Sequence, residues 1–162
     1  LTETVVPGDS FMIPLTITSL TAHSLPSGVS FAREAWLETI VTDSTDNILF
    51  QSGTTATNSS ALDETDEDLL LFTSYLLDEK GDVTESVTDV HEQINNSLTA
   101  FSKRYYSYTI NTSDEYFGEI NIQVRMLFRS FKPSVLAAHP DLLQNISIFE
   151  MEILNRTIYA QL

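Results

Sequence analysis

The segment Gly118–Arg129 constrains the fold more than any other part of the chain, because its side chains alternate between apolar and polar. One set of alternate positions holds Ile120, Ile122, Val124, Met126 and Phe128, and the other holds Glu119, Asn121, Gln123, Arg125 and Arg129. Successive side chains of a β-strand point to opposite faces of its sheet. This period of two, interrupted only by Leu127, predicts a long antiparallel strand with a buried face and a wet face.

Other segments carry similar alternation, or the β-branched and aromatic residues that strands favour. The predicted strands are residues 11–19, 35–43, 48–51, 104–110 and 148–154, with residues 155–162 as a last strand. Pro14 cannot donate a ladder hydrogen bond, which predicts that the first of these strands lies at a sheet edge or a bulge. Seven to eight short strands with turn residues between them predict an all-β fold, an immunoglobulin-like antiparallel β-sandwich.

The remaining segments are assigned from composition and spacing. Residues 69–77 are apolar on both faces, so periodicity does not distinguish a buried strand from a buried helix. We favour the strand. Residues 83–98 place four β-branched side chains at helix-like spacing, although such residues make a poor helix. Residues 133–138 suggest one short helix, started by Pro133 and ended or kinked by Pro140. The acidic residues 52–68 predict a surface loop.

Length and charge limit the classes of protein and partner. The chain has 162 residues, about the length of one domain, so we expect a single β-sandwich domain over residues 1–162. It carries 23 acidic against 8 basic side chains, a formal charge of −15. Such a field repels phosphate backbones and anionic lipid, so we expect neither a nucleic-acid partner nor membrane insertion. No apolar run is long enough to cross a bilayer.

The motifs that usually carry catalysis are missing from the sequence. The chain contains no cysteine, which excludes disulfides, thiolate metal sites and the CxxCH attachment of a covalent c-type haem. The three histidines, His23, His91 and His139, have no partner at the spacing of a metal motif such as HExxH. There is also no Gly-x-Ser-x-Gly elbow and no glycine-rich phosphate loop. We therefore expect that the chain is not an enzyme.

One acidic turn gathers oxygen ligands of the kind that Ca²⁺ prefers. Asp43, Asp46 and Asn47 follow a predicted strand within five residues, but they lack the ordered spacing of an EF-hand loop. The alternative is a solvated, charged turn that binds no ion. We keep these three residues as a candidate calcium site.

The most distinctive pattern begins with residues 19–28, Ser-Leu-Thr-Ala-His-Ser-Leu-Pro-Ser-Gly. It continues with Arg-Glu-Ala-Trp-Leu at 33–37 and Ile-Leu-Phe-Gln-Ser-Gly at 48–53. In this order the pieces resemble the haem-free β-sandwich domain found toward the C-terminus of many multihaem c-type cytochromes. That family has Gly-His-x-x-Pro-Thr-Gly, then Arg-x-x-Trp-Leu, then a strand ending in Ser-Gly. The resemblance spans most of the chain, although no single motif is diagnostic.

Individual motif residues carry over from the resemblance. His23, Pro26 and Gly28 stand where the family has its His, Pro and Gly, and Arg33 and Trp36 match the following strand. Small residues replace small ones at positions 22 and 27. We expect Trp36 to be the large aromatic of the sandwich core and Arg33 to pair with an acidic neighbour. His23 is either a distal axial ligand, in trans, to a haem held elsewhere, or a side chain that hydrogen-bonds its own turn.

The resemblance implies a role and a compartment. It implies a non-catalytic structural and interaction module of an extracytoplasmic electron-transfer protein, periplasmic or extracellular, that scaffolds or shields haems and mediates assembly. The partner would be a multihaem cytochrome domain or subunit, with self-assembly also open, and the chain would be a fragment or subunit of that larger system. The competing hypothesis is an exported immunoglobulin-like adhesion or carbohydrate-binding module without a redox partner.

Overall fold

The computed structural model describes residues 4–161, which form eleven strands and one short helix. The strands are β1 Thr4–Val5, β2 Ser10–Thr18, β3 Glu34–Asp43, β4 Ile48–Ser52, β5 Leu71–Phe72, β6 Ser74–Leu77, β7 Val83–Thr84, β8 Glu92–Asn95, β9 Lys103–Asn111, β10 Gly118–Arg129 and β11 Ile148–Ala160; the helix is α1 Pro140–Leu143. The fold is therefore all-β, as the alternation predicted. The strands beyond the predicted seven or eight are two- to four-residue segments that periodicity does not detect.

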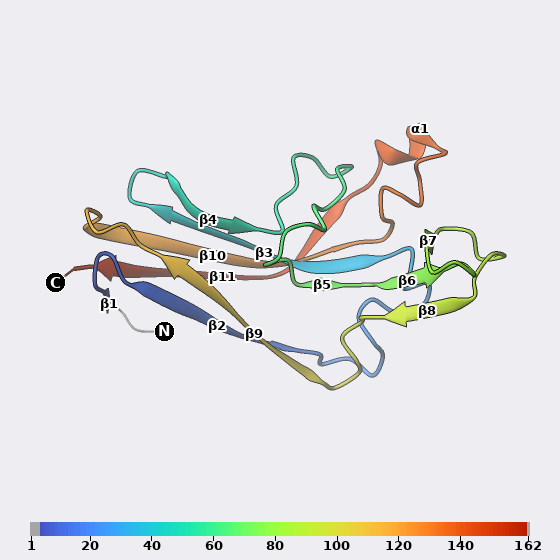
Figure 1. Cartoon of the computed structure of the whole chain (residues 1–162), viewed down its shortest axis with the longest axis horizontal. Coiled ribbons are helices and arrows are strands. Elements are labelled where there is room, and N and C mark those ends of the chain that lie inside the picture. The colour runs from blue at the N-terminus through green and yellow to red at the C-terminus, as the bar shows by residue number, and fades with distance from the viewer. Residues whose placement is uncertain (1–3, 162) are drawn as a thin grey trace.

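Two sheets of unequal width face each other (Figure 1). The larger sheet has the order β1-β11-β10-β3-β4, and β5 also pairs with β3. The second sheet contains only β2 and β9, and a small third sheet, β7-β6-β8, lies at one end of the molecule. The strand pairs are antiparallel except for β1 and β11, which run parallel. The sandwich prediction is thus confirmed, and Pro14 lies in an edge strand as expected.

The main core fills the space between the two sheets. The alternating apolar side chains of β10 point into it, and all of them are buried except Phe128, which is partly buried. They meet Phe11 and Ile13 of β2 and Tyr108 and Ile110 of β9. From β11, however, only Ile158 and Ala160 join this core. The two-stranded sheet therefore covers β10 and β3 and leaves most of β11 uncovered.

A second, smaller core lies on the other face of the larger sheet, and it corrects the expectation for Trp36. Trp36 is fully buried, but it packs with Leu62, Leu71 and Leu127 rather than in the inter-sheet core. Its indole Nε1 donates to the Gly53 carbonyl at 2.9 Å. Alternation in β3 sets Trp36 on the face opposite Ala35 and Leu37, and the segment after β4 covers it. Leu127, the interruption in the β10 pattern, is the cross-strand partner of Trp36.

The predicted helix over residues 133–138 is wrong. These residues form successive turns, in which the Leu136 amide donates to the Pro133 carbonyl, and the helix instead begins at Pro140. Pro140 has no N–H to continue a helix from Leu136 and disfavours helical backbone at the preceding residue, yet it fits a first helical position. Residues 69–77 form β5 and β6, which confirms the strand. Residues 83–98 form β7 and β8 around an irregular segment, so the helix-like spacing there is accidental.

None of the helices within residues 4–161 has the length and apolar character to cross a membrane.

Candidate functional site

The turn that contains His23 is held by the backbone on both sides. Leu25 exchanges two backbone hydrogen bonds with Leu98, each with an N–O distance of 2.8 Å. The next residue, Pro26, is fully buried and follows a cis peptide bond. These contacts fix residues 25–26 against the segment that leads into β9, while residues 20–23 remain exposed. His23 is therefore exposed at the surface, next to residues 25–26, which hydrogen bonds and burial hold in place.

The His23 imidazole is exposed, and one of its nitrogens is committed to the turn. Nδ1 lies 3.1 Å from the Ser24 carbonyl oxygen, which can only accept, so Nδ1 is the protonated nitrogen. In a neutral imidazole the lone pair then belongs to Nε2, the nitrogen that metal-bound histidines commonly use while Nδ1 donates to a carbonyl. Both roles expected of His23, a turn contact and a free ligand nitrogen, are compatible with this geometry.

Arg33 closes the same turn, in a different way from the one expected. Its Nη1 donates to the Ser27 carbonyl at 2.9 Å, and the ion pairs found between described residues include none with Arg33. Gly28 has φ +69°, and a Cβ there would lie 3.4 Å from Arg33 Nη1. Glycine suits this position because of its left-handed backbone conformation, since a Cβ at 3.4 Å would make only an ordinary van der Waals contact with the guanidinium. Pro26, Gly28 and Arg33 are thus structural residues of one turn.

The candidate calcium turn already satisfies its first carboxylate. Asp43 Oδ1 accepts from the Thr45 amide and hydroxyl at 2.7 and 2.8 Å and from the Asn47 amide at 3.0 Å. Asn47 Nδ2 donates to Oδ2 at 2.8 Å. The hydrogen bonds from Asn47 and Thr45 lower the pKa of Asp43 to about 2. Calcium binding, which stays a prediction, would require Asp43 to exchange these donors for the ion.

Asp46 of the same turn has φ 63°, a left-handed conformation that Asp tolerates better than most residues. Across residues 4–161, no three His, Asp or Glu side chains lie close enough together to hold a metal ion.

Sequence reasoning missed a buried cluster of charges on the outer face of the larger sheet. Arg129, expected to be solvated, is completely buried and forms an ion pair from Nε to Glu34 Oε1. Its Nη1 donates to the carbonyls of Asn58 and Ser60 at 3.0 and 2.7 Å, and its guanidinium stacks over Trp36 at 5.3 Å. Strand register places Arg129 directly opposite Glu34. The sequence carries no signal that residues 54–62 fold over this face.

Burial perturbs the charges of this cluster. It raises the pKa of the Glu34 carboxyl, against the opposing pull of Arg129 and Lys132. It also lowers the pKa of Lys132, whose Nζ donates to the Ser74 carbonyl at 3.2 Å and lies 4.6 Å from the centre of the Tyr75 ring. We assign the Arg129–Glu34 pair to holding segment 54–62 on the sheet, since Arg129 binds the Asn58 and Ser60 carbonyls, whereas Lys132 holds the segment around Ser74 and Tyr75.

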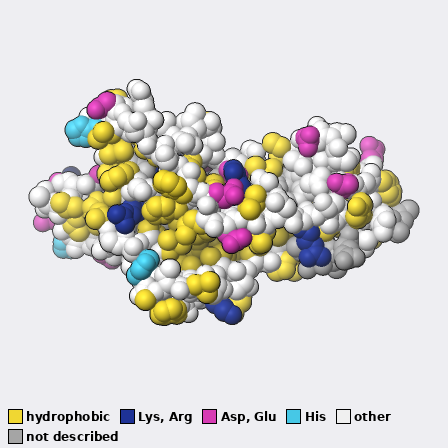
Figure 2. Space-filling model, turned by 180° about the vertical axis from the view of Figure 1, so that it is seen from behind, with side chains coloured by type: hydrophobic (Ala, Val, Ile, Leu, Met, Phe, Trp, Pro, Cys, Tyr) yellow, Lys and Arg dark blue, Asp and Glu magenta, His cyan; other side chains and the backbone are white. Residues whose placement is uncertain are grey.

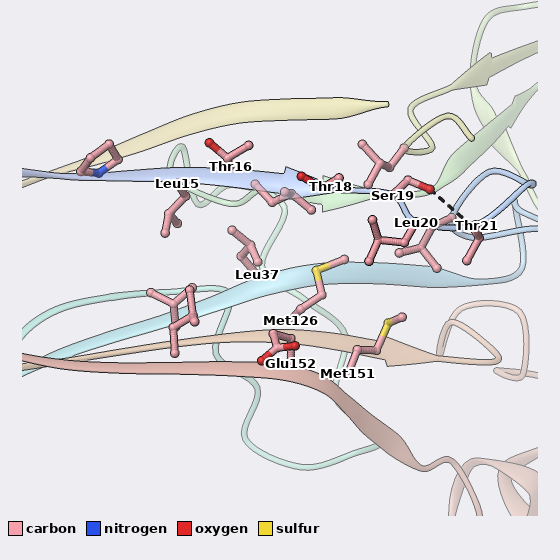
Figure 3. Close-up of a pocket in the computed structure, with 16 residues that line it drawn as sticks. Leu15, Thr16, Thr18, Ser19, Leu20, Thr21, Leu37, Met126, Met151 and Glu152 are labelled. Atoms are coloured by element: carbon pink, nitrogen blue, oxygen red, sulfur yellow. Dashed lines mark hydrogen bonds between the residues drawn. The ribbon is translucent and has the colours of Figure 1, made fainter. Parts of the chain in front are cut away.

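A long hollow opens between β2 and β11, and we call it the β2–β11 groove (Figure 3). Leu15 of β2, Leu37 of β3 and Met126 of β10 point into it, while Met151 and Glu152 lie on β11 along the opposite wall. Its volume is about 460 Å³, and Glu152 is the only ionisable residue among those that line it. The groove exists because the β2–β9 sheet does not reach across to β11.

The side chains around the groove are exposed apolar groups. Leu20 is 83% exposed, Leu154 56% and Met151 50%. A neighbouring pocket of about 350 Å³ is lined by Phe131, Phe149 and residues near α1, and Phe149 lies two positions before Met151 on β11. Figure 2 shows hydrophobic side chains gathered on the back of the molecule, toward the end where α1 lies. An apolar strip of this kind is typical of surfaces that another molecule covers.

Two comparisons with known proteins gave no match: neither a family model nor a curated protein matches this chain. Among solved structures, the fold is similar to that of a penta-heme cytochrome c552 from Thermochromatium tepidum, with a TM-score of 0.73 and 16% sequence identity. The similarity covers 92% of this chain and 36% of that one. This chain therefore corresponds to about a third of the length of that protein, and at this identity the likeness is one of fold.

Proposed function

We propose that the chain is a non-catalytic structural and interaction module of an extracytoplasmic multihaem cytochrome system, in which it scaffolds or shields haems and mediates assembly. The observation that carries the proposal is the fold. Nearly the whole chain superposes on part of a protein described as a penta-heme cytochrome. A domain that retains the complete sandwich, yet matches only a portion of such a protein, is what an accessory module would look like.

The chemistry of the sequence supports a partner that supplies the haem. With no cysteine, these 162 residues contain no CxxCH attachment for a c-type haem. The haem would therefore belong to another domain of the same protein or to another subunit. The match of residues 19–37 to the motif of haem-free cytochrome domains, made on sequence alone, points in the same direction as the fold.

His23 is the residue that we propose to reach the haem, as a distal axial ligand in trans. Three observations support it: the ring is exposed, Nδ1 donates to the Ser24 carbonyl, and this donation leaves the Nε2 lone pair free. The base of the turn is fixed through Leu25 and Leu98, so a ligand placed there would be presented in a defined position.

The decisive experiment purifies the protein from its source with antibodies against this domain, under conditions that keep assemblies intact. We expect the product to be red, with the absorbance of reduced c-type haem and with haem staining on the same polypeptide or on a stoichiometric partner. A colourless product free of haem would contradict the proposal. If it were also retained on immobilised glycans, the adhesion or carbohydrate-binding hypothesis would replace it.

A further inference from the structure

The sandwich lacks a strand on one side. The larger sheet continues through β10 to β11, but the opposing sheet stops at β2, and among residues 4–161 only β9 pairs with β2. Most of the inner face of β11, apart from Ile158 and Ala160, is therefore uncovered by the described residues. Leu154 is more than half exposed although it lies on the same face of the sheet as the buried Ile158, four residues farther along the same strand.

The space beside β2 suits an extended segment of chain, because it lies between the free edge of a strand and an apolar groove. The free edge of β2 offers unpaired backbone groups, except at Pro14, which has no N–H to donate, and such groups are a template for pairing with another chain. Beside it, the β2–β11 groove provides an apolar floor formed by Val124, Met126 and Leu154. A strand added to β2 would place alternate side chains into this groove and its other side chains into solvent, which is how strand addition combines affinity with specificity.

The negative charge of the groove favours a cationic occupant. Glu152 lines the groove, and among the described residues its carboxylate has no hydrogen-bond or ion-pair partner. An occupant that places a cation opposite Glu152 would pair this carboxylate. A second copy of the chain fits poorly, because it would bring a further formal charge of −15 to the same surface.

We propose that the β2–β11 groove accepts an extended segment of a basic partner protein, which pairs with β2 and directs apolar side chains and one Lys or Arg into the groove. This inference rests on the proposed function, since it names the surface by which the module would meet its partner. It is tested on the isolated domain without any haem, so its failure and the failure of the haem proposal can be told apart.

The test uses two synthetic peptides as probes, acetyl-Thr-Ile-Thr-Lys-Thr-Val-Thr-amide and the same peptide with Glu in place of Lys. Binding to the isotope-labelled domain is followed by NMR, together with hydrogen exchange of the β2 amides. We expect the Lys peptide to bind about fivefold more tightly than the Glu peptide, the size of effect that one surface ion pair supports, and to slow exchange along β2. Glu152→Lys should reverse the preference.

Two matched variants separate the groove from the rest of the strand. Leu154→Lys places a charge in the groove and should abolish binding, whereas Ile153→Lys alters the neighbouring residue on the opposite face of β11 and should leave binding unchanged. Both side chains are already exposed, so both variants should fold. Failure of both peptides to bind at millimolar concentration, or binding that survives Leu154→Lys, would overturn the proposal. A concentration-dependent dimer that Leu154→Lys dissolves would assign the groove to a second copy instead.

Discussion

Replacing Arg129 with methionine would remove a fully buried cation and leave its partner, Glu34, buried with only the weaker attraction of Lys132. Breaking one side of a buried ion pair typically costs about 3–5 kcal/mol. The carbonyls of Asn58 and Ser60, which Arg129 also binds, lie on more exposed residues and can turn to water, so they add little. We therefore expect the free energy of unfolding to fall by about 4 kcal/mol, a large share of the roughly 5–15 kcal/mol typical of a folded domain.

The assay is urea unfolding at neutral pH, followed by circular dichroism and by the fluorescence of Trp36, the only tryptophan in the chain. Arg125→Met is the matched control. Arg125 forms a similar cross-strand pair with Glu38 at 2.5 Å, in which the Glu38 side chain is 8% exposed but that of Arg125 is 32% exposed. Its loss should therefore cost less than that of Arg129, about 1–2 kcal/mol. The double variant Arg129→Met with Glu34→Leu should recover much of the lost stability, because it leaves no unpaired carboxylate.

The reasoning would be refuted if Arg129→Met and Arg125→Met cost the same within experimental error. It would also fail if the double variant were less stable than Arg129→Met alone. Either result would mean that the burial of the pair does not set its contribution.

Three further perturbations follow from other parts of the structure. Gly53→Ala should destabilise the fold by roughly 2–4 kcal/mol in the same urea assay, because a Cβ at this φ of +67° would lie 2.2 Å from the Leu37 carbonyl oxygen. Asp43→Asn should make the free energy of unfolding depend less on pH between about pH 4 and pH 2. The lowered pKa of Asp43 stabilises the fold at pH values above the ordinary pKa of 3.8, and this contribution is lost as the pH falls toward 2. His23→Ala should leave the unfolding of the isolated domain within about 0.5 kcal/mol of the parent, because its hydrogen bond is exposed, while changing the haem spectrum of the assembled complex.

Each of these predictions has its own control. Gly81→Ala tests backbone strain alone, since φ is +85° but nothing lies within 4 Å of the added Cβ; it should cost only about 1 kcal/mol. For Asp43→Asn, equal slopes of stability against pH for parent and variant would contradict the pKa argument. An unchanged haem spectrum for His23→Ala in the complex would end the ligand hypothesis and assign the ring to its turn.

Strands were predicted correctly where one face of the strand is exposed to solvent and the other is buried. The bounds of β10 agree with the alternation in residues 118–129, and β9 likewise buries Tyr108 and Ile110 on one face. The pattern could not reveal that a loop covers the second face of the larger sheet, because residues 54–62 are polar and read as solvated. For this reason the alternation places Trp36 in the inter-sheet core and Arg129 in solvent, whereas the structure buries both on the other face of the larger sheet.

For the candidate site too, local features could be predicted from the sequence, and features that depend on the topology could not. The His23 turn was recognisable because its proline and glycine have local conformational roles, which a sequence displays directly. The β2–β11 groove was not recognisable, since it results from a difference in the number of strands between two sheets. The alternation of residues 148–154 resembles that of any half-buried strand, and only the topology shows that nothing covers Leu154.

The pairing of β1 with β11 determines how the fold would respond to tension. These two strands run parallel, with Thr4 opposite Tyr159 and Val5 opposite Ala160, although they come from opposite ends of the described chain. A pull that separates the two ends would draw them past each other along their length, so the bonds between them would share the load in shear rather than open one at a time.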